Sequence, residues 1–139
     1  MIPEEKVFEK LRKVLMADSI IDGYVERRVY LDHPSTIKEP KYPAISFSLI
    51  QSSADVSVIT QASMEIQIDV WLDNNKHTNE DLLTIQRRVR ALLHRQSLSD
   101  TSIDNLIVQQ ILEALVGPVM YEQDTNLLHL PIRYSVVAI

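Results

Sequence analysis

Apolar and polar residues alternate most regularly in residues 64–72. Apolar side chains occupy every second position there, and the positions between them hold polar residues and Trp71. A period of two residues is typical of a β-strand with one face in the core and the other in water. Residues 127–139 alternate in the same way, with Leu128, Leu130, Ile132, Tyr134, Val136 and Ala138 on one face. The pattern therefore predicts two long strands, the second of which runs to the C-terminus.

Two other segments have the period of a helix. In residues 3–16 the apolar positions 7, 8, 11, 14 and 15 form one stripe, and Pro3 suits a first helical turn because its missing N–H would have no partner there. The second helix begins after Thr78, which forms with Asp81 a pattern resembling a capping box, and its apolar stripe extends through Gln96. Its first turn is acidic and its end is basic, as the helix dipole favours.

The rest of the chain contains shorter elements. We expect a turn at Asp22-Gly23, a strand over residues 24–31, a proline-rich loop to residue 43, a strand over residues 44–49 and a long hairpin connection over residues 51–62. Residues 106–116 also fit a helix, but we favour two strands, 106–115 and 116–123, broken at Gly117-Pro118. This order predicts a single α+β domain of residues 1–139, with an antiparallel or mixed β-sheet and two amphipathic helices packed on one face.

Composition narrows the possible functions. The 139 residues include no cysteine, which excludes a thiol nucleophile and thiolate metal sites, and two isolated glycines, which exclude the glycine-rich phosphate loops. The net charge of −5 is the wrong sign for a domain that grips phosphate over its whole surface. Because there is no long apolar run and no secretory leader, we expect a soluble protein made in a cytoplasm.

No constellation of residues predicts catalysis. The four histidines, at positions 33, 77, 94 and 129, lack the spacing of a helical metal site, and no serine lies in a glycine-flanked nucleophile elbow. Asp69 and Asp73 flank Trp71 on an outward strand face, where a solvated strand end explains them better than acid–base chemistry does. We therefore expect no enzyme activity, no metal and no cofactor.

Apolar residues in positions that alternation assigns to water point instead to an interface. Trp71 lies on the polar face of its strand, although a loop of the same chain is an equally good cover for it. Similar cases occur in the long connection and, with Leu127, Val137 and Ile139, on the last strand. The arginines of the second helix suit phosphate or an acidic neighbour, or simply a solvated helix end. The predicted interface residues are Val56, Val58, Ile59, Trp71, Arg87 and Arg88.

Several short segments occur in a characteristic order. After the first helix come Arg27-Arg28-Val29-Tyr30, a proline loop into Tyr42-Pro43-Ala44-Ile45, a long hairpin, the second helix, Tyr121-Glu122-Gln123-Asp124 and Leu128-His129-Leu130-Pro131-Ile132-Arg133-Tyr134. In order and spacing, over nearly the whole chain, the sequence resembles the tail terminator or tail-completion proteins of long-tailed bacteriophages. Pro131 departs from an ideal ladder and argues against a central position for the last strand.

The resemblance implies a virion protein of the head–tail junction that assembles in the host cytoplasm. Its partners would be copies of itself in a hexameric ring, the tail tube protein and a neck or head-completion protein, with no membrane. Such a ring caps the tail tube, stops its polymerisation and joins the head, while DNA passes through without specific binding. The alternatives are another neck or head-completion component, or a small cellular ligand-binding or hydrolase domain.

Overall fold

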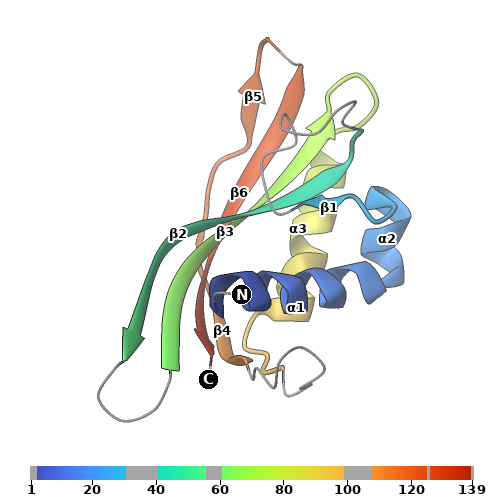
Figure 1. Ribbon diagram of the computed structural model, residues 1–139. Helices are drawn as coiled ribbons and strands as arrows, with labels where there is room; N and C mark the ends of the chain where they lie inside the picture. The colour runs from blue at the N-terminus through green and yellow to red at the C-terminus, as the bar shows by residue number, and fades with distance from the viewer. Residues whose placement is uncertain (1–2, 31–40, 56–60, 99–107, 125, 139) are drawn as a thin grey trace.

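Three helices cover one face of a six-stranded sheet in the described residues of a computed structural model (Figure 1), namely 3–30, 41–55, 61–98, 108–124 and 126–138. The elements in chain order are α1 (Pro3–Ala17), α2 (Ser19–Val25), β1 (Val29–Tyr30), β2 (Ala44–Asp55), β3 (Gln61–Asp73), α3 (Asn79–Leu93), β4 (Val108–Val116), β5 (Met120–Glu122) and β6 (Leu127–Ala138). The expected α+β class is confirmed. None of the described helices has the length and apolar character that crossing a membrane requires.

The sheet is mixed, with the strand order β1-β2-β3-β6-β4, and β5 also pairs with β6. β1 runs parallel to β2, and every other pair is antiparallel. The two strands predicted from alternation, β3 and β6, lie side by side with Ile68 opposite Ile132. Because their registers match, their apolar positions share one face, and this face meets the helices.

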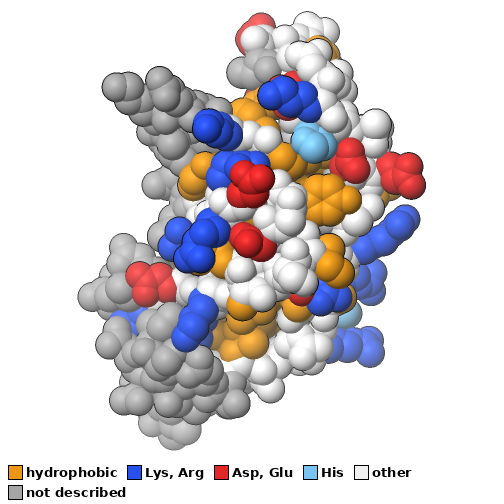
Figure 2. Space-filling model, turned by 90° about the vertical axis from the view of Figure 1, so that its right-hand side faces the viewer, with side chains coloured by type: hydrophobic (Ala, Val, Ile, Leu, Met, Phe, Trp, Pro, Cys, Tyr) orange, Lys and Arg blue, Asp and Glu red, His pale blue; other side chains and the backbone are white. Residues whose placement is uncertain are grey.

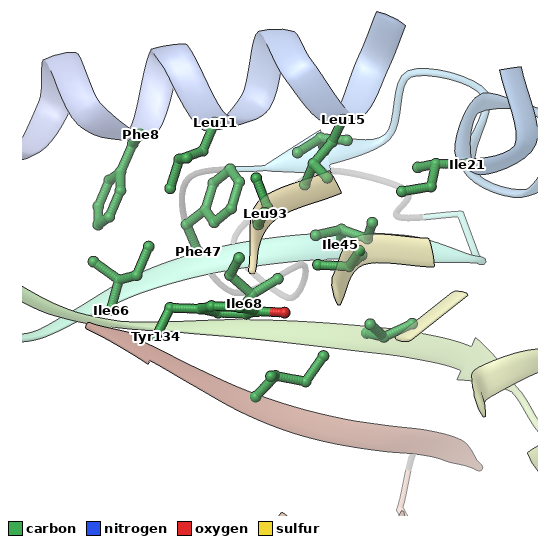
Figure 3. Close-up of a cluster of buried hydrophobic side chains, with 14 of the residues drawn as sticks. Phe8, Leu11, Leu15, Ile21, Ile45, Phe47, Ile66, Ile68, Leu93 and Tyr134 are labelled. Carbon is green, nitrogen blue, oxygen red and sulfur yellow. The ribbon is translucent and has the colours of Figure 1, made fainter. Parts of the chain in front are cut away.

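The core lies between this face and the helices (Figure 3). Phe8, Leu11 and Leu15 of α1 point toward the sheet, and the ring of Phe8 stacks on that of Phe47 with 5.6 Å between centroids. α3 buries Leu82, Ile85, Val89 and Leu93. Fully burying one such side chain contributes about 1.5–3 kcal/mol. The faces predicted for both amphipathic helices are therefore confirmed.

Local capping sets the ends of α3. The Thr78 backbone N–H donates to the Asp81 carboxylate at 3.0 Å within a capping box, so the predicted start is confirmed. The helix ends at Leu93, earlier than predicted, because His94 is extended and Arg95 has a positive φ of 61°. Neither conformation continues an α-helix.

A third helix, α2, replaces the predicted turn at Asp22-Gly23 and the first residues of the predicted 24–31 strand. Asp18 caps it by accepting the Ile21 N–H at 3.1 Å, and Glu26 ends it in the left-handed conformation. Ile21 and Val25, four residues apart, are both buried. Tertiary burial of this helical pair outweighs the β-propensity of the segment, so within the described part of the predicted strand β1 comprises Val29–Tyr30.

The predicted 51–62 connection is also wrong at both ends. β2 continues to Asp55 and β3 begins at Gln61, so polar residues extend the hairpin until Asp55 lies opposite Gln61. The ladder bonds join backbone groups, so the added pairs need no apolar pattern. A register shift between Leu49 and Gln51 breaks the apolar alternation that predicted the strand over residues 44–49.

β6 lies in the interior of the sheet, contrary to the expectation from Pro131. The Gly117 N–H donates to the Pro131 carbonyl at 2.8 Å. The nitrogen and the carbonyl of a strand residue point toward the same neighbouring strand, so the nitrogen of Pro131, which has no hydrogen to donate, also faces the 117–119 segment between β4 and β5. The proline therefore costs no ladder bond, because the neighbouring strand is interrupted at that point. Residues 108–116 form the predicted strand, whereas β5 is shorter than predicted.

Candidate assembly surfaces

An exposed apolar surface follows the break between β4 and β5. Leu115 is 55% exposed and Tyr121 is 50% exposed, and Val116 and Met120 are exposed beside them. Leu115 and Met120 pair with Arg133 and His129, and Val116 and Tyr121 pair with Ile132 and Leu128, so the four side chains lie on both faces of one sheet edge. Exposed large hydrophobic side chains concentrated at one edge are typical of a contact with another molecule. We call these four residues the edge patch.

The rest of the β4 edge is covered by the chain itself. Leu98 and Val108 exchange two backbone hydrogen bonds, and the Arg95 N–H donates to the Ile111 carbonyl at 2.7 Å. Further along, the Glu113 N–H donates to Nδ1 of His94 at 2.9 Å. An uncovered sheet edge invites pairing with another chain. These bonds end at Glu113, so the edge patch begins where the cover ends.

A second exposed apolar pair lies in β2. Leu49 and Ile50 are both exposed at the register shift of the β2–β3 hairpin. Consecutive strand residues normally point to opposite faces, and the bulge brings both into solvent. These residues were not among those predicted for the interface, because alternation assigned Leu49 to the core and the bulge has no local sequence signal.

Trp71 lies inside the chain and not on its surface. It is only 2% exposed, its indole N–H donates to Oγ of Ser46 at 2.9 Å, and its ring stacks on His129 with 4.0 Å between centroids. Nε2 of His129 lies 2.5 Å from Oδ1 of Asp69, which is also buried. The expectation of a wet tryptophan is wrong, because cross-strand neighbours on the same face cover it. The chain itself covers Trp71, as the alternative expected, but it does so with strand residues of β2 and β6 and not with a loop.

The two predicted arginines have different roles. Arg88 forms a bidentate ion pair with Asp18, with Nη2 2.6 Å from Oδ1 and Nε 3.0 Å from Oδ2. This hydrogen bonding lowers the pKa of Asp18 and raises that of Arg88. Arg88 therefore joins α3 to the N-cap of α2. Arg87, one residue earlier, is exposed.

The arginines of α3 lie in its C-terminal half, and Figure 2 shows Lys and Arg side chains on both sides of the view, including its right-hand margin. Arg87, Arg90, Ala91 and His94 line a shallow hollow, and the Arg90 side chain is 55% exposed. Nε of Arg90 lies 3.6 Å from a carboxylate oxygen of Glu113. We call Arg87, Arg90 and Arg95 the basic stripe.

Three predicted interface residues, Val56, Val58 and Ile59, lie outside the described residues, as does Ile139. Of the other apolar residues noted on the last strand, Leu127 is buried and Val137 is partly buried. Of the predicted interface residues that the structure describes, Trp71 is buried, Arg88 is partly buried and Arg87 is exposed. The edge patch was missed, although the Gly117-Pro118 break inside an apolar segment marks its position in the sequence.

A larger open pocket of about 740 Å³ lies between α2, the start of β2 and the β3–α3 turn, and is lined by Gly23, Tyr24, Glu26, Arg28, Lys41, Tyr42, Pro43, Asp73, Lys76 and His77. Arg28 is held within the chain, because it donates to the Pro43 and Tyr24 carbonyls and to Glu26. Burial raises the pKa of Tyr42, and the negative charge of Glu122 adds to the effect. In the described part of the chain, no group of three His, Asp or Glu side chains is placed to hold a metal ion.

Glu113 and Tyr134 form a buried polar pair beneath the basic stripe. The two residues lie opposite each other on β4 and β6, and Tyr134 is fully buried. Burial, with a further contribution from the charge of Glu113, raises the pKa of the Tyr134 hydroxyl. Tyr134 therefore stays neutral, and the charge at this point is that of Glu113 and its partner Arg90.

Comparison with solved structures shows a shared fold. No protein-family model matches the sequence, and a comparison with curated proteins finds no match either. A solved chain described as "Virion of native gene transfer agent (GTA) particle" resembles the structure with a TM-score of 0.69 and 12% sequence identity. The match covers 92% of this chain and 90% of that chain. At this identity the likeness shows a shared fold.

Proposed function

We propose that this chain is a structural subunit of a phage-like virion, and within it a ring-forming tail terminator at the head–tail junction. The observation that carries the proposal is the fold shared with a virion chain over nearly the full length of both proteins. The order of short segments that resembles tail terminators supports the finer role. Six copies would close a ring on the end of the tail tube, stop its growth and offer a surface to the neck, with DNA passing through.

The exposed side chains support an assembly role over an enzymatic one. The edge patch and the Leu49–Ile50 pair are apolar and lie on open strand segments, as a subunit contact requires. In the open pocket beside α2, in contrast, the charged side chain of Arg28 is bound by Pro43 and Glu26 of the chain itself. A ligand-binding or hydrolase domain would direct convergent polar groups into such a pocket.

Electron microscopy of the purified protein, alone and mixed with tail tubes, tests the proposal. We expect rings that sit on one end of each tube, and tubes that no longer grow when tube subunits are added. Rings that bind only heads or neck complexes would favour the alternative of another neck or head-completion component. A protein that stays monomeric with tail tubes and with heads would contradict a virion role.

A further inference from the structure

The two ends of α3 lie in surroundings of opposite charge. Its C-terminal half carries the basic stripe, and its first turn carries Glu80 and Asp81. The β5–β6 turn belongs to the acidic end, because the Asn74 N–H donates to the Asn126 carbonyl at 3.1 Å and so joins this turn to the β3–α3 turn. Figure 1 shows both turns at the same end of the molecule.

At the acidic end, negatively charged side chains outnumber positively charged ones. Its described carboxylates are Asp73, Glu80, Asp81, Glu122 and Asp124, and its lysines are Lys41 and Lys76. Arg28 and Glu26 of the same pocket form an ion pair with each other. Glu80 and Asp124 are exposed, so their charges face solvent. The first turn of a helix also favours negative charge, so the helix dipole of α3 suits the carboxylates of Glu80 and Asp81.

The basic stripe remains available after the contacts within the chain are made. Arg88 is engaged by Asp18 and does not belong to it. Arg87 and Arg95 are exposed, and Arg90 keeps more than half of its side chain in solvent although it lies near Glu113. Although the net charge of the chain is −5, its described residues therefore include a cationic stripe that is largely exposed.

Each charged region lies close in sequence to part of the edge patch. Leu115 and Val116 follow Glu113, the residue that contacts Arg90. Met120 and Tyr121 precede Glu122 and Asp124, and the Tyr121 hydroxyl donates to Asn126 at the same turn. Exposed ion pairs alone contribute little affinity, so a contact of this kind needs apolar area, while the charges orient it.

We propose that the basic stripe of one copy binds the acidic end of the next copy, in a head-to-tail contact that uses the edge patch for apolar area. This inference rests on the proposed function and names the subunit contact of the ring. The occupant is a second copy because the chain itself supplies both complementary charges, on two different surfaces. A contact between two different surfaces propagates from copy to copy and closes into a ring when the rotation per copy allows it.

Two charge-reversal variants test the contact. The basic-end variant is Arg87→Glu with Arg95→Glu, and the acidic-end variant is Glu80→Lys with Asp124→Lys. All four positions are exposed, so both variants should keep the circular dichroism spectrum and thermal unfolding of the wild type. We expect each variant to be monomeric in sedimentation velocity at concentrations where the wild type forms rings.

Mixing the two variants gives the decisive result. The basic-end variant is negative on both surfaces and the acidic-end variant is positive on both, so a head-to-tail contact predicts that an equimolar mixture forms rings in which the two variants alternate. The chain with all four substitutions should form rings again, because both charges are reversed together. The rings of the wild type should dissociate as salt is raised, since the charges that orient the contact become screened.

The matched control is Arg27→Glu, which makes the same change at an exposed arginine outside the stripe and should leave the rings intact. Rings formed by either charge-reversal variant alone, or a mixture that forms no rings, would overturn the contact while leaving the proposed function standing. Duplex DNA bound by the wild type and lost in the basic-end variant, with ring formation unchanged, would assign the stripe to phosphate and also overturn it. A wild-type protein that forms no rings, either alone or when mixed with tail tubes, would overturn both proposals.

Discussion

Gly117 lies against Pro131 more closely than a residue with a side chain allows. A Cβ at position 117 would lie 2.6 Å from Cγ of Pro131 and 3.3 Å from its carbonyl oxygen, while the Gly117 N–H donates to that same oxygen. Contacts below 3 Å between carbon atoms are strongly repulsive, and the proline ring is confined within β6. Because residue 117 is a glycine, the 117–119 segment can pack directly against Pro131 of β6.

Replacing Gly117 by alanine should destabilise the protein by about 1–3 kcal/mol, because the added methyl group overpacks this contact. Urea unfolding followed by circular dichroism measures the change. Gly23→Ala is the matched control, since no atom lies within 4 Å of a Cβ there and the residue is in a helix. We expect that control to gain about 0.5–1 kcal/mol. Equal effects at the two glycines would contradict the steric argument.

Ile68→Asp should prevent folding. Ile68 is fully buried in β3 against the helices, and an unpaired carboxylate at this position has no partner to offset its desolvation. The milder Ile68→Ala should lower the free energy of unfolding by about 2–5 kcal/mol. Ser63→Asp, on an exposed position of the same strand, should fold normally. A soluble Ile68→Asp protein with wild-type thermal stability would show that the register is wrong.

The Asp18–Arg88 pair should make stability depend on pH on the acid side. The folded pKa of Asp18 lies below its ordinary value of 3.8, chiefly because Arg88 donates to it. A lowered carboxyl pKa stabilises the folded state above pH 3.8, and this contribution disappears as the pH falls through the folded pKa. Thermal melts between pH 6 and pH 2 should therefore show a flatter acid limb for Asp18→Asn and for Arg88→Gln than for the wild type.

Asp18 also caps α2, and a further variant separates this role from the ion pair. Asparagine is a good N-cap, so Asp18→Asn removes the charge and keeps the cap. Asp18→Ala removes both and should cost about 1 kcal/mol more. If the Asp18→Ala and Asp18→Asn proteins were equally stable at neutral pH, the N-cap would contribute nothing measurable.

The fluorescence of Trp71, the only tryptophan, measures how well the polar face of the sheet is covered at that residue. Trp71 is covered in part by the stacked ring of His129, so His129→Ala should expose the indole and shift its fluorescence emission to longer wavelength. His129→Phe keeps a stacking ring but loses the contact with Asp69, so its emission should stay close to that of the wild type while its thermal stability falls. A hydrogen bond to a charged group contributes about 1.5–3 kcal/mol. Unchanged emission in His129→Ala would mean that other atoms cover Trp71.

The sequence by itself determined the elements whose signals are local. β3 and β6 follow from alternation alone, because a two-residue period specifies which face is buried. α3 follows from its apolar stripe and from the Thr78–Asp81 capping box, whose bonds span three residues. The α+β class follows from the order of these elements.

The tertiary structure decided what depends on partners far apart in the chain. The helix α2 exists where β-propensity predicts a strand because it buries Ile21 and Val25, and Arg88 is joined to Asp18 across seventy residues. Trp71 is covered because His129 lies opposite it in a register that no local pattern encodes. Pro131 is tolerated in the sheet interior because the neighbouring strand is interrupted at Gly117. These contacts depend on chain positions that folding brings together, and for that reason the exposed surfaces they leave behind could not be identified from the sequence alone.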